Sequence, residues 1–397
     1  MQEISLSSAI NTGNVAFMVI TTVLVFFMTP GLAFFYGGLV EKRNSSTMMF
    51  YTFISIGIVT VLWFLGGFSM VFGKDCGGII GNPTQYFMLK GVDFSVNSNY
   101  GKTIPFLMFF VYQLMFAIIT APLMTGAFAN RMRPVSWIWM QILWMILIYF
   151  PVAHWVWGGG FLSKLGFVDY AGGTVIHTTA GFSALIAIIL LGKRKVIPPK
   201  NYSNINLVLI GTAILAFGWF GFNSGGALAA REVAAVAFVN SAIAAGFAMV
   251  VWMLISYHYK RKFSFVELTT GMIAGLATIT PASGYVTPQS AAIIAILAAI
   301  GCYFFVEILK KWNVDDALGV WGVHGMGGFM GTIYIGFFAD SRVNIVEASV
   351  NQLLIQTLGV VIVAIYSFAI TYIIMKIVGG KVPSTVQIRG LDEEYME

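Results

Sequence analysis

The sequence predicts an all-α membrane protein with eleven transmembrane helices. Only 10% of its 397 residues are charged, against about 25% in soluble globular domains. Hydrophobic residues make up 58% of the chain, and its mean hydropathy is +0.85. So little charge cannot build a water-facing surface around a core. Nucleic-acid-binding, disordered and disulfide-scaffold classes are therefore excluded.

Eleven apolar stretches are long enough to cross a bilayer, which takes about 20 residues. They are helices, because backbone polar groups in lipid must be bonded within the segment, and the runs are too continuous for barrel strands. The predicted spans are 15–39, 48–72, 104–126, 135–157, 172–191, 205–225, 233–257, 266–281, 289–309, 317–338 and 350–377. We expect one membrane domain over residues 1–397, ending in a cytoplasmic tail over 378–397.

The distribution of the cationic residues predicts the orientation of the bundle. With the N-terminus outside, sixteen of the 22 lysines and arginines fall on the inner side, and the positive-inside rule favours that arrangement. The inner set is Lys42, Arg43, Arg131, Arg133, Lys193, Arg194, Lys195, Lys200, Lys260, Arg261, Lys262, Lys310, Lys311, Lys376, Lys381 and Arg389. The net charge of +6 is thus a topology signal, and not a nucleic-acid-binding patch.

A motif of the form D-x2-G-x4-H-x3-G occurs twice. Its first copy starts at Asp169 and contains His177, and its second starts at Asp316 and contains His324. The copies fall in the fifth and tenth predicted spans, so equivalent helices run in opposite directions across the membrane. The pattern predicts an inverted repeat of spans 1–5 and 6–10, an architecture in which the functional site lies near the midplane.

A histidine at membrane depth is costly unless it has a function. The pseudo-symmetry brings His177 and His324 face to face, where two neutral imidazoles can share one hydrogen bond. The alternative is a purely structural role, in which both histidines hydrogen-bond backbone carbonyl groups that have no other partner. Cys76 and Cys302 lie far apart, and no Cys/His cluster has metal-ligand spacing, so we expect no metal and no cofactor.

Several segments together resemble the ammonium transporter (Amt/Mep/Rh) family, and more closely its microbial and plant Amt branch. They follow one another in order over nearly the whole chain. They are Pro30–Gly38 (PGLAFFYGG), Ala153–Gly160 (AHWVWGGG), Asp169–His177 (DYAGGTVIH), Gly218–Asn223 (GWFGFN) and Gly322–Gly325 (GVHG). The resemblance implies a homotrimer in the plasma (inner) membrane, with one pore per subunit and ammonium or ammonia as substrate.

The resemblance also implies roles for aromatic residues. The family's outer cation site falls on Trp157 and Phe116, with Tyr112 where the family often has Phe. The stacked gate rings fall on Phe116 and Phe222, with Trp219 beside them in the pore. Aromatic faces attract a cation that loses its water, which fits these positions. Trp157 alone also fits an interfacial belt residue.

Two positions leave alternatives open. Asp169 matches an acid of the family, and we expect it either to orient the loop around the outer site or to handle protons. Gly226 stands where the family usually has a serine whose hydroxyl accepts a bond from ammonium. We expect the outer site to lack that acceptor, and a Gly226→Ser replacement to fit and to restore it.

The tail keeps part of a family element, Gln387–Asp392 (QIRGLD), and then departs from it with Glu393–Glu397 (EEYME). The resemblance implies contact with a PII-type regulatory protein. The altered ending instead suits a fused C-terminal signalling domain and an ammonium sensor that conducts little.

Three hypotheses follow: an ammonium transporter, an ammonium-sensing receptor module, and an intramembrane serine hydrolase. The last would use Ser224 as nucleophile and His324 as base, which requires the two within hydrogen-bond reach. The repeated histidine gives no role to a serine, so we expect no enzyme activity.

Overall fold

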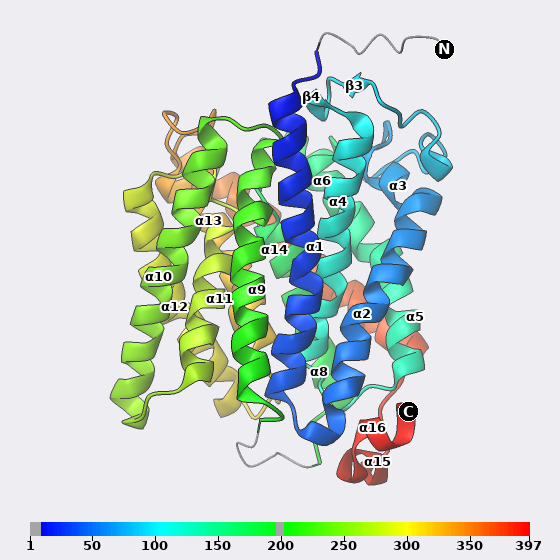
Figure 1. The fold of residues 1–397 in the computed structure, drawn as a ribbon, viewed down its shortest axis with the longest axis vertical. Coiled ribbons are helices and arrows are strands. Elements are labelled where there is room, and N and C mark those ends of the chain that lie inside the picture. Colours follow the sequence, from blue (N-terminus) through cyan, green and yellow to red (C-terminus); the bar gives the residue numbers. More distant parts are fainter. Residues whose placement is uncertain (1–8, 196–201) are drawn as a thin grey trace.

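The protein folds into one helical bundle whose helices run mostly along its long axis (Figure 1). This computed structural model describes residues 9–195 and 202–397. Lys200, counted above among the inner cations, lies outside the described residues. Short strands and the start of the first helix lie at one end, here named the hairpin end. The last two helices lie at the other, the tail end.

The first half of the bundle contains long helices interrupted by single wider turns. Its helices are α1 (Thr12–Leu39), α2 (Ser45–Leu62), α3 (Phe68–Phe72), α4 (Phe106–Thr120), α5 (Pro134–Trp144), α6 (Phe150–Trp157), α7 (Phe161–Lys164) and α8 (Thr179–Leu191). π-helical turns join α2 to α3 through Trp63–Gly67 and α5 to α6 through Met145–Tyr149. Each pair therefore continues as one transmembrane rod.

The second half begins at Ile205. Its helices are α9 (Ile205–Ser224), α10 (Glu232–Lys260), α11 (Phe265–Ile279), α12 (Pro288–Lys311), α13 (Met326–Phe338) and α14 (Val350–Val378), followed by the tail helices α15 (Ser384–Arg389) and α16 (Leu391–Tyr395). Figure 1 shows α1 and α9 side by side, and they share the largest packed interface in the bundle. These are the first helices of the two predicted halves.

Helices occupy all eleven predicted ranges. Within the described residues, nine helical rods are long and apolar enough to cross a membrane. The other two predicted ranges hold shorter helices. The eighth corresponds to α11, which ends at Ile279, and the tenth to α13 together with the π-helical turn Trp321–Gly325.

Two small hairpins close the hairpin end: β1 (Asp75–Cys76) with β2 (Ile80–Gly81), and β3 (Val96–Asn97) with β4 (Gly101–Pro105). The first is tied to α6 by His154, whose Nε2 lies 3.0 Å from Asp75 Oδ1 and whose Nδ1 lies 2.7 Å from the Val71 carbonyl oxygen. Hydrogen bonds from Lys164 and His154 lower the pKa of Asp75 to about 2. His154 is thus fully buried, and it anchors the first hairpin.

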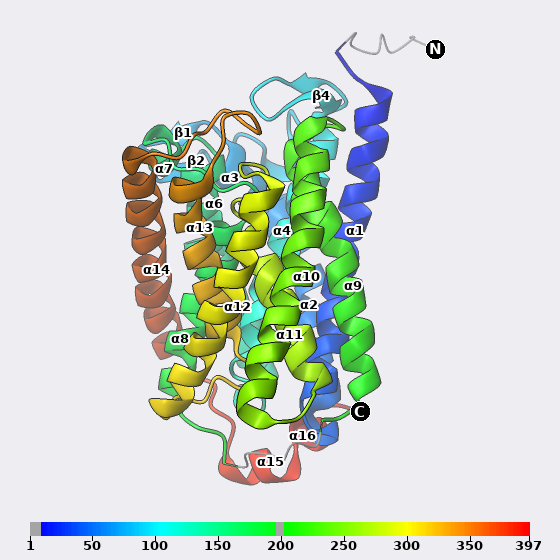
Figure 2. The ribbon, with the colours of Figure 1, turned by 90° about the vertical axis from the view of Figure 1, so that its left-hand side faces the viewer.

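The tail packs under the tail end of the bundle, where α15 and α16 cross it (Figure 2). Helix α2 has no capping side chain of its own at Asn44. Instead, the Asp392 carboxylate accepts the N–H bonds of Ser46 (2.9 Å) and Thr47 (2.7 Å). In return, Asn44 Oδ1 accepts the N–H of Leu391 (2.9 Å). The tail therefore supplies the N-cap of a membrane helix.

Because Asp392 caps α2 from the tail, we predict that Asp392→Ala weakens the attachment of the tail to the bundle. Loss of a capping carboxylate costs about 1 kcal/mol, which raises the population of the undocked tail about fivefold. Limited trypsin digestion of the purified protein at Lys381 and Arg389 measures this opening. Glu393→Ala, on the exposed side of the same helix, is the matched control. Equal cleavage rates for both variants would show that the cap does not hold the tail.

Candidate functional site

The two copies of the repeated motif cross at glycines. A Cβ added to Gly181 would lie 2.1 Å from the Cα of Gly325, so only glycine permits this contact between the two backbones. Reciprocally, a Cβ added to Gly328 would lie 2.8 Å from the Cβ of His177. The final glycine of each copy thus packs on the histidine segment of the other copy.

Both histidine segments begin as π-helical turns, Gly173–Thr178 and Trp321–Gly325, a form that recurs at functional sites. The acid of each motif caps its own turn. Asp316 accepts the N–H groups of Val320 (3.0 Å) and Trp321 (2.8 Å). The Asp169 carboxylate accepts four N–H bonds of 2.7 to 3.0 Å, from Gly172, Gly173, Thr174 and Val175.

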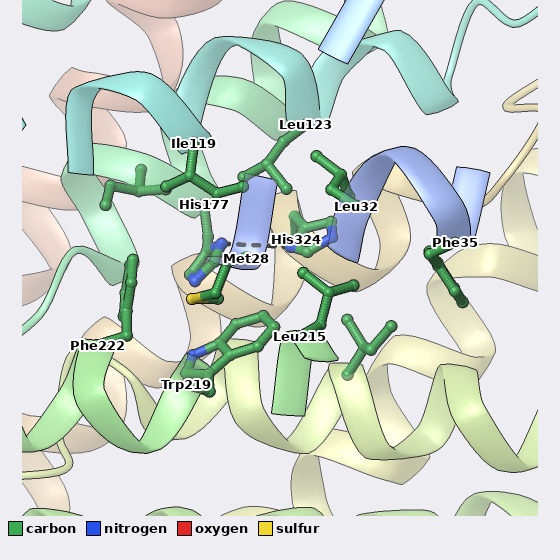
Figure 3. Close-up of a pocket in the computed structure, with 12 residues that line it drawn as sticks. Met28, Leu32, Phe35, Ile119, Leu123, His177, Leu215, Trp219, Phe222 and His324 are labelled. Carbon is green, nitrogen blue, oxygen red and sulfur yellow. Dashed lines mark hydrogen bonds between the residues drawn. The ribbon is translucent and has the colours of Figure 1, made fainter. Parts of the chain in front are cut away.

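The crossing brings the two histidines together. His177 Nδ1 and His324 Nδ1 lie 3.2 Å apart, and the rings lie at 24° with centroids 5.2 Å apart (Figure 3). One ring must donate and the other accept, so at least one of them is neutral at this nitrogen. His177 Nε2 is buried without a hydrogen-bond partner among the described residues.

The histidines line a narrow apolar cavity with Trp219, Phe222 and aliphatic side chains of α1 and α4 (Figure 3). Its volume of about 10 Å³ is close to the room that one water molecule needs. Trp219 stacks on His177 with ring centroids 5.5 Å apart, and its Nε1 donates to Thr280 Oγ1 (2.9 Å). The cavity therefore has room for about one small molecule.

Two stacked phenylalanines separate this cavity from a wider one. The rings of Phe116 and Phe222 lie 4.3 Å apart at 21°. Phe222 lines the narrow cavity, whereas Phe116 lines the wider cavity at the hairpin end, here named the vestibule. The stacked rings thus lie between the residues that line the two cavities.

The vestibule has a volume of about 330 Å³ and combines aromatic and polar side chains. Trp157 meets Phe116 edge to face at 6.1 Å, and Tyr112 meets Phe116 at 4.8 Å. Trp157 Nε1 donates to the Asp169 carbonyl oxygen (2.8 Å), and the Tyr112 hydroxyl donates to the Phe222 carbonyl oxygen (3.0 Å). Trp157 and Tyr112 are thus held by backbone acceptors.

Gly226 also lines the vestibule, but the expectation that serine fits there is wrong. A Cβ at this position would lie 2.9 Å from Cε1 of Tyr170 and 3.0 Å from the Tyr170 carbonyl oxygen. The tyrosine ring occupies the space that a serine side chain needs. A side chain at position 226 therefore requires the Tyr170 ring to shift.

The sequence interpretation missed two vestibule residues, Tyr170 and Arg231. Tyr170 lies inside the quoted DYAGG segment, so its hydroxyl was visible in the sequence, but its contact with Gly226 depends on the fold. Arg231 places a positive charge at the vestibule. The nearest signal in the sequence was its position between two predicted spans.

Comparison with known proteins agrees with this geometry. The profile of the Ammonium Transporter Family matches residues 16–396. The chain is 41% identical to an ammonium transporter of Aquifex aeolicus, over 98% of this chain and 91% of that protein. It is 40% identical to the ammonium transporter Amt1 of Archaeoglobus fulgidus, over 96% and 97%.

Solved structures share the fold. The crystal structure of Candida albicans Mep2 aligns with a TM-score of 0.89 at 33% identity, over 96% of this chain and 89% of that one. A structure described as a sensor Amt protein aligns with a TM-score of 0.88 at 30% identity, over 97% and 98%. The relatives are named as transporters, and none of those named here is an enzyme. This multi-pass membrane protein therefore belongs to the ammonium transporter family.

Proposed function

We propose that the protein carries ammonium across the membrane by recruiting NH4+ in the vestibule and passing NH3 along the paired histidines. The observation that carries the proposal is the succession of an aromatic vestibule, a closed pair of rings and a narrow cavity with two imidazoles. Each compartment suits a different form of the substrate.

Recruitment depends on the vestibule aromatics. Trp157 and Phe116 present ring faces to a cation that is losing water, and such contacts contribute about 2 kcal/mol or more when desolvated. The hydrogen bond from Trp157 Nε1 to the Asp169 carbonyl oxygen already fixes the indole. Binding of the cation therefore loses little further conformational entropy at this side chain. NH4+ retains four N–H donors that need acceptors in the same cavity.

Passage requires the loss of a proton. A bare cation in the middle of a membrane costs several kcal/mol, whereas ammonia is neutral and can hydrogen-bond to imidazole. The narrow cavity is apolar except for His177 and His324, so it favours the neutral form. We infer that deprotonation occurs where the vestibule ends, at the Phe116–Phe222 pair. The released proton follows along the hydrogen-bonded His177 and His324 rings, so that one proton accompanies each ammonia molecule and one net charge crosses.

We assign Asp169 an orienting role. A carboxylate has about four lone-pair positions, and four backbone N–H groups already occupy them. Its carbonyl oxygen holds Trp157. Asp169 thus fixes both the π-helical turn before His177 and the recruiting indole, and it has no free lone pair to accept a proton from the substrate.

The proposed transport also has consequences for the membrane topology and the assembly of the protein. We propose one membrane domain over residues 1–397 with eleven spans, an outside N-terminus and a cytoplasmic tail in the plasma (inner) membrane. The hairpin end would then face outward, so that the vestibule meets external ammonium. We further propose a homotrimer, with a PII-type protein or a fused signalling domain as partner of the tail.

A second candidate function is ammonium sensing with little conduction. The likeness to the sensor Amt protein over nearly the whole chain favours it, as does the absence of a serine hydroxyl at Gly226. Both functions need the vestibule, but only transport needs passage beyond the phenylalanines. Ammonium-induced current across a solid-supported membrane distinguishes them, since a sensor binds ammonium without current.

The vestibule assignment predicts that Trp157→Leu weakens recruitment at low ammonium concentration. Leucine has no ring quadrupole, and loss of about 2 kcal/mol raises the half-saturating concentration roughly tenfold or more. The measurement is ammonium-dependent current in proteoliposomes. Trp139→Leu, an exposed residue on α5, is the matched control. An unchanged half-saturation in Trp157→Leu would mean that the cation site lies elsewhere.

The histidine pair predicts that His177→Ala or His324→Ala changes conduction without unfolding the protein. Each variant removes a hydrogen-bond partner from an otherwise apolar cavity, worth about 1 kcal/mol, so we expect at least about a fivefold change in rate. His258→Ala, at the exposed end of α10, serves as control. Wild-type currents in both folded variants would remove the histidines from the pathway.

A further inference from the structure

The ring of Tyr170 lies in the vestibule wall between two glycines, Gly226 and Gly284. A Cβ at Gly226 would lie 2.9 Å from one edge of its ring, and a Cβ at Gly284 would lie 2.1 Å from Cε2 on the other edge. Its backbone N–H donates to the Pro281 carbonyl oxygen (3.1 Å), and Tyr285 packs edge to face on the ring at 5.7 Å. The phenol, which belongs to the first half of the chain, is thus held by groups of the second half.

The hydroxyl of this fixed ring has no partner. Tyr170 Oη is buried, and the described residues offer it no hydrogen bond. The polar atoms of Trp157 and Tyr112 are instead satisfied by backbone carbonyls. A buried hydroxyl without a partner is costly, and burial raises the pKa of the Tyr170 phenol, so it stays neutral. No described protein group therefore uses its lone pairs, and Tyr170 is one of the residues that line the vestibule.

We propose that Tyr170 determines the specificity of the vestibule: its hydroxyl oxygen accepts an N–H bond from the recruited ammonium ion. It would supply the acceptor that a serine at Gly226 provides in the resembling transporters. The two positions are alternatives because the tyrosine ring and a serine side chain compete for one space. This inference rests on the proposed recruitment of ammonium in the vestibule.

The decisive variant is Tyr170→Phe, which removes one oxygen and keeps the ring between its two glycines. A hydrogen bond to a charged group is among the stronger ones, so the half-saturating ammonium concentration should rise about tenfold. The maximal current should stay within about twofold, because the rings and histidines are untouched. Concentration–current curves on proteoliposomes measure both quantities.

Tyr100→Phe is the matched control, since the Tyr100 hydroxyl at the vestibule rim already donates to the Phe72 carbonyl oxygen (2.7 Å). We expect it to keep the wild-type half-saturation. The proposal is overturned if Tyr170→Phe also keeps it, or if only the maximal current falls, as a purely structural role would give.

Glycine 226 gives a second, independent test. Gly226→Ala and Gly226→Ser both press on the Tyr170 ring and carbonyl, so both should raise the half-saturation and neither should lower it. Tighter recruitment in Gly226→Ser would mean that a serine hydroxyl is simply missing, and would contradict the role of Tyr170. These variants decide the question even if Tyr170→Phe fails to fold.

Failure of the proposed transport gives a different pattern. If the wild type binds ammonium by calorimetric titration but carries no current, transport is refuted, and the same variants then test Tyr170 by their binding constants. If the wild type neither conducts nor binds ammonium, recruitment in the vestibule is refuted, and the Tyr170 inference with it.

Discussion

The pore depends on one constraint, the close crossing of the two repeated segments at glycines. Gly181 and Gly328 let backbones meet where any side chain would collide with the opposite histidine segment. This approach sets the separation of the imidazole nitrogens at 3.2 Å. Had the segments been held apart by methyl groups, the histidines could not share a hydrogen bond, and two unpaired polar rings would remain in an apolar cavity.

The same repeat organises the two ends of the pathway differently. Asp169 and Asp316 each cap a histidine segment, but only Asp169 also fixes an aromatic residue of the vestibule through its carbonyl oxygen. Asp316 lies at the tail end, next to the N–H of Ala317, which donates to the Ala127 carbonyl oxygen (3.1 Å). A single sequence pattern therefore supplies the shared scaffold, whereas the vestibule residues Trp157 and Phe116 lie outside it.

Sequence reasoning succeeded where the relevant residues form a repeat or a hydropathy pattern along the chain. The repeat identified His177 and His324 as a pair, and hydropathy located helices in every predicted range. It failed where the outcome depends on three-dimensional contacts between distant residues. Whether serine fits at Gly226 depends on the ring of Tyr170, and whether α2 is capped depends on Asp392, far along the chain. Neither contact has a periodicity or spacing that a linear sequence displays.

At the tail end, the buried guanidinium of Arg131 is stabilised by an ion pair with Asp315. The Arg131 side chain is fully buried and lies 3.7 Å from Asp315, which also accepts two bonds from Arg194 (2.7 and 2.9 Å). Burial lowers the pKa of Arg131 to about 10, so the guanidinium remains charged at neutral pH.

Removing one partner of such a buried pair is strongly destabilising, because an uncompensated charge remains. The backbone oxygen of Arg131 accepts the N–H of Val382 in the tail (2.9 Å), and Asp315 directly precedes the acid that caps the His324 segment. The tail, the buried ion pair and the second histidine thus form one continuous set of contacts.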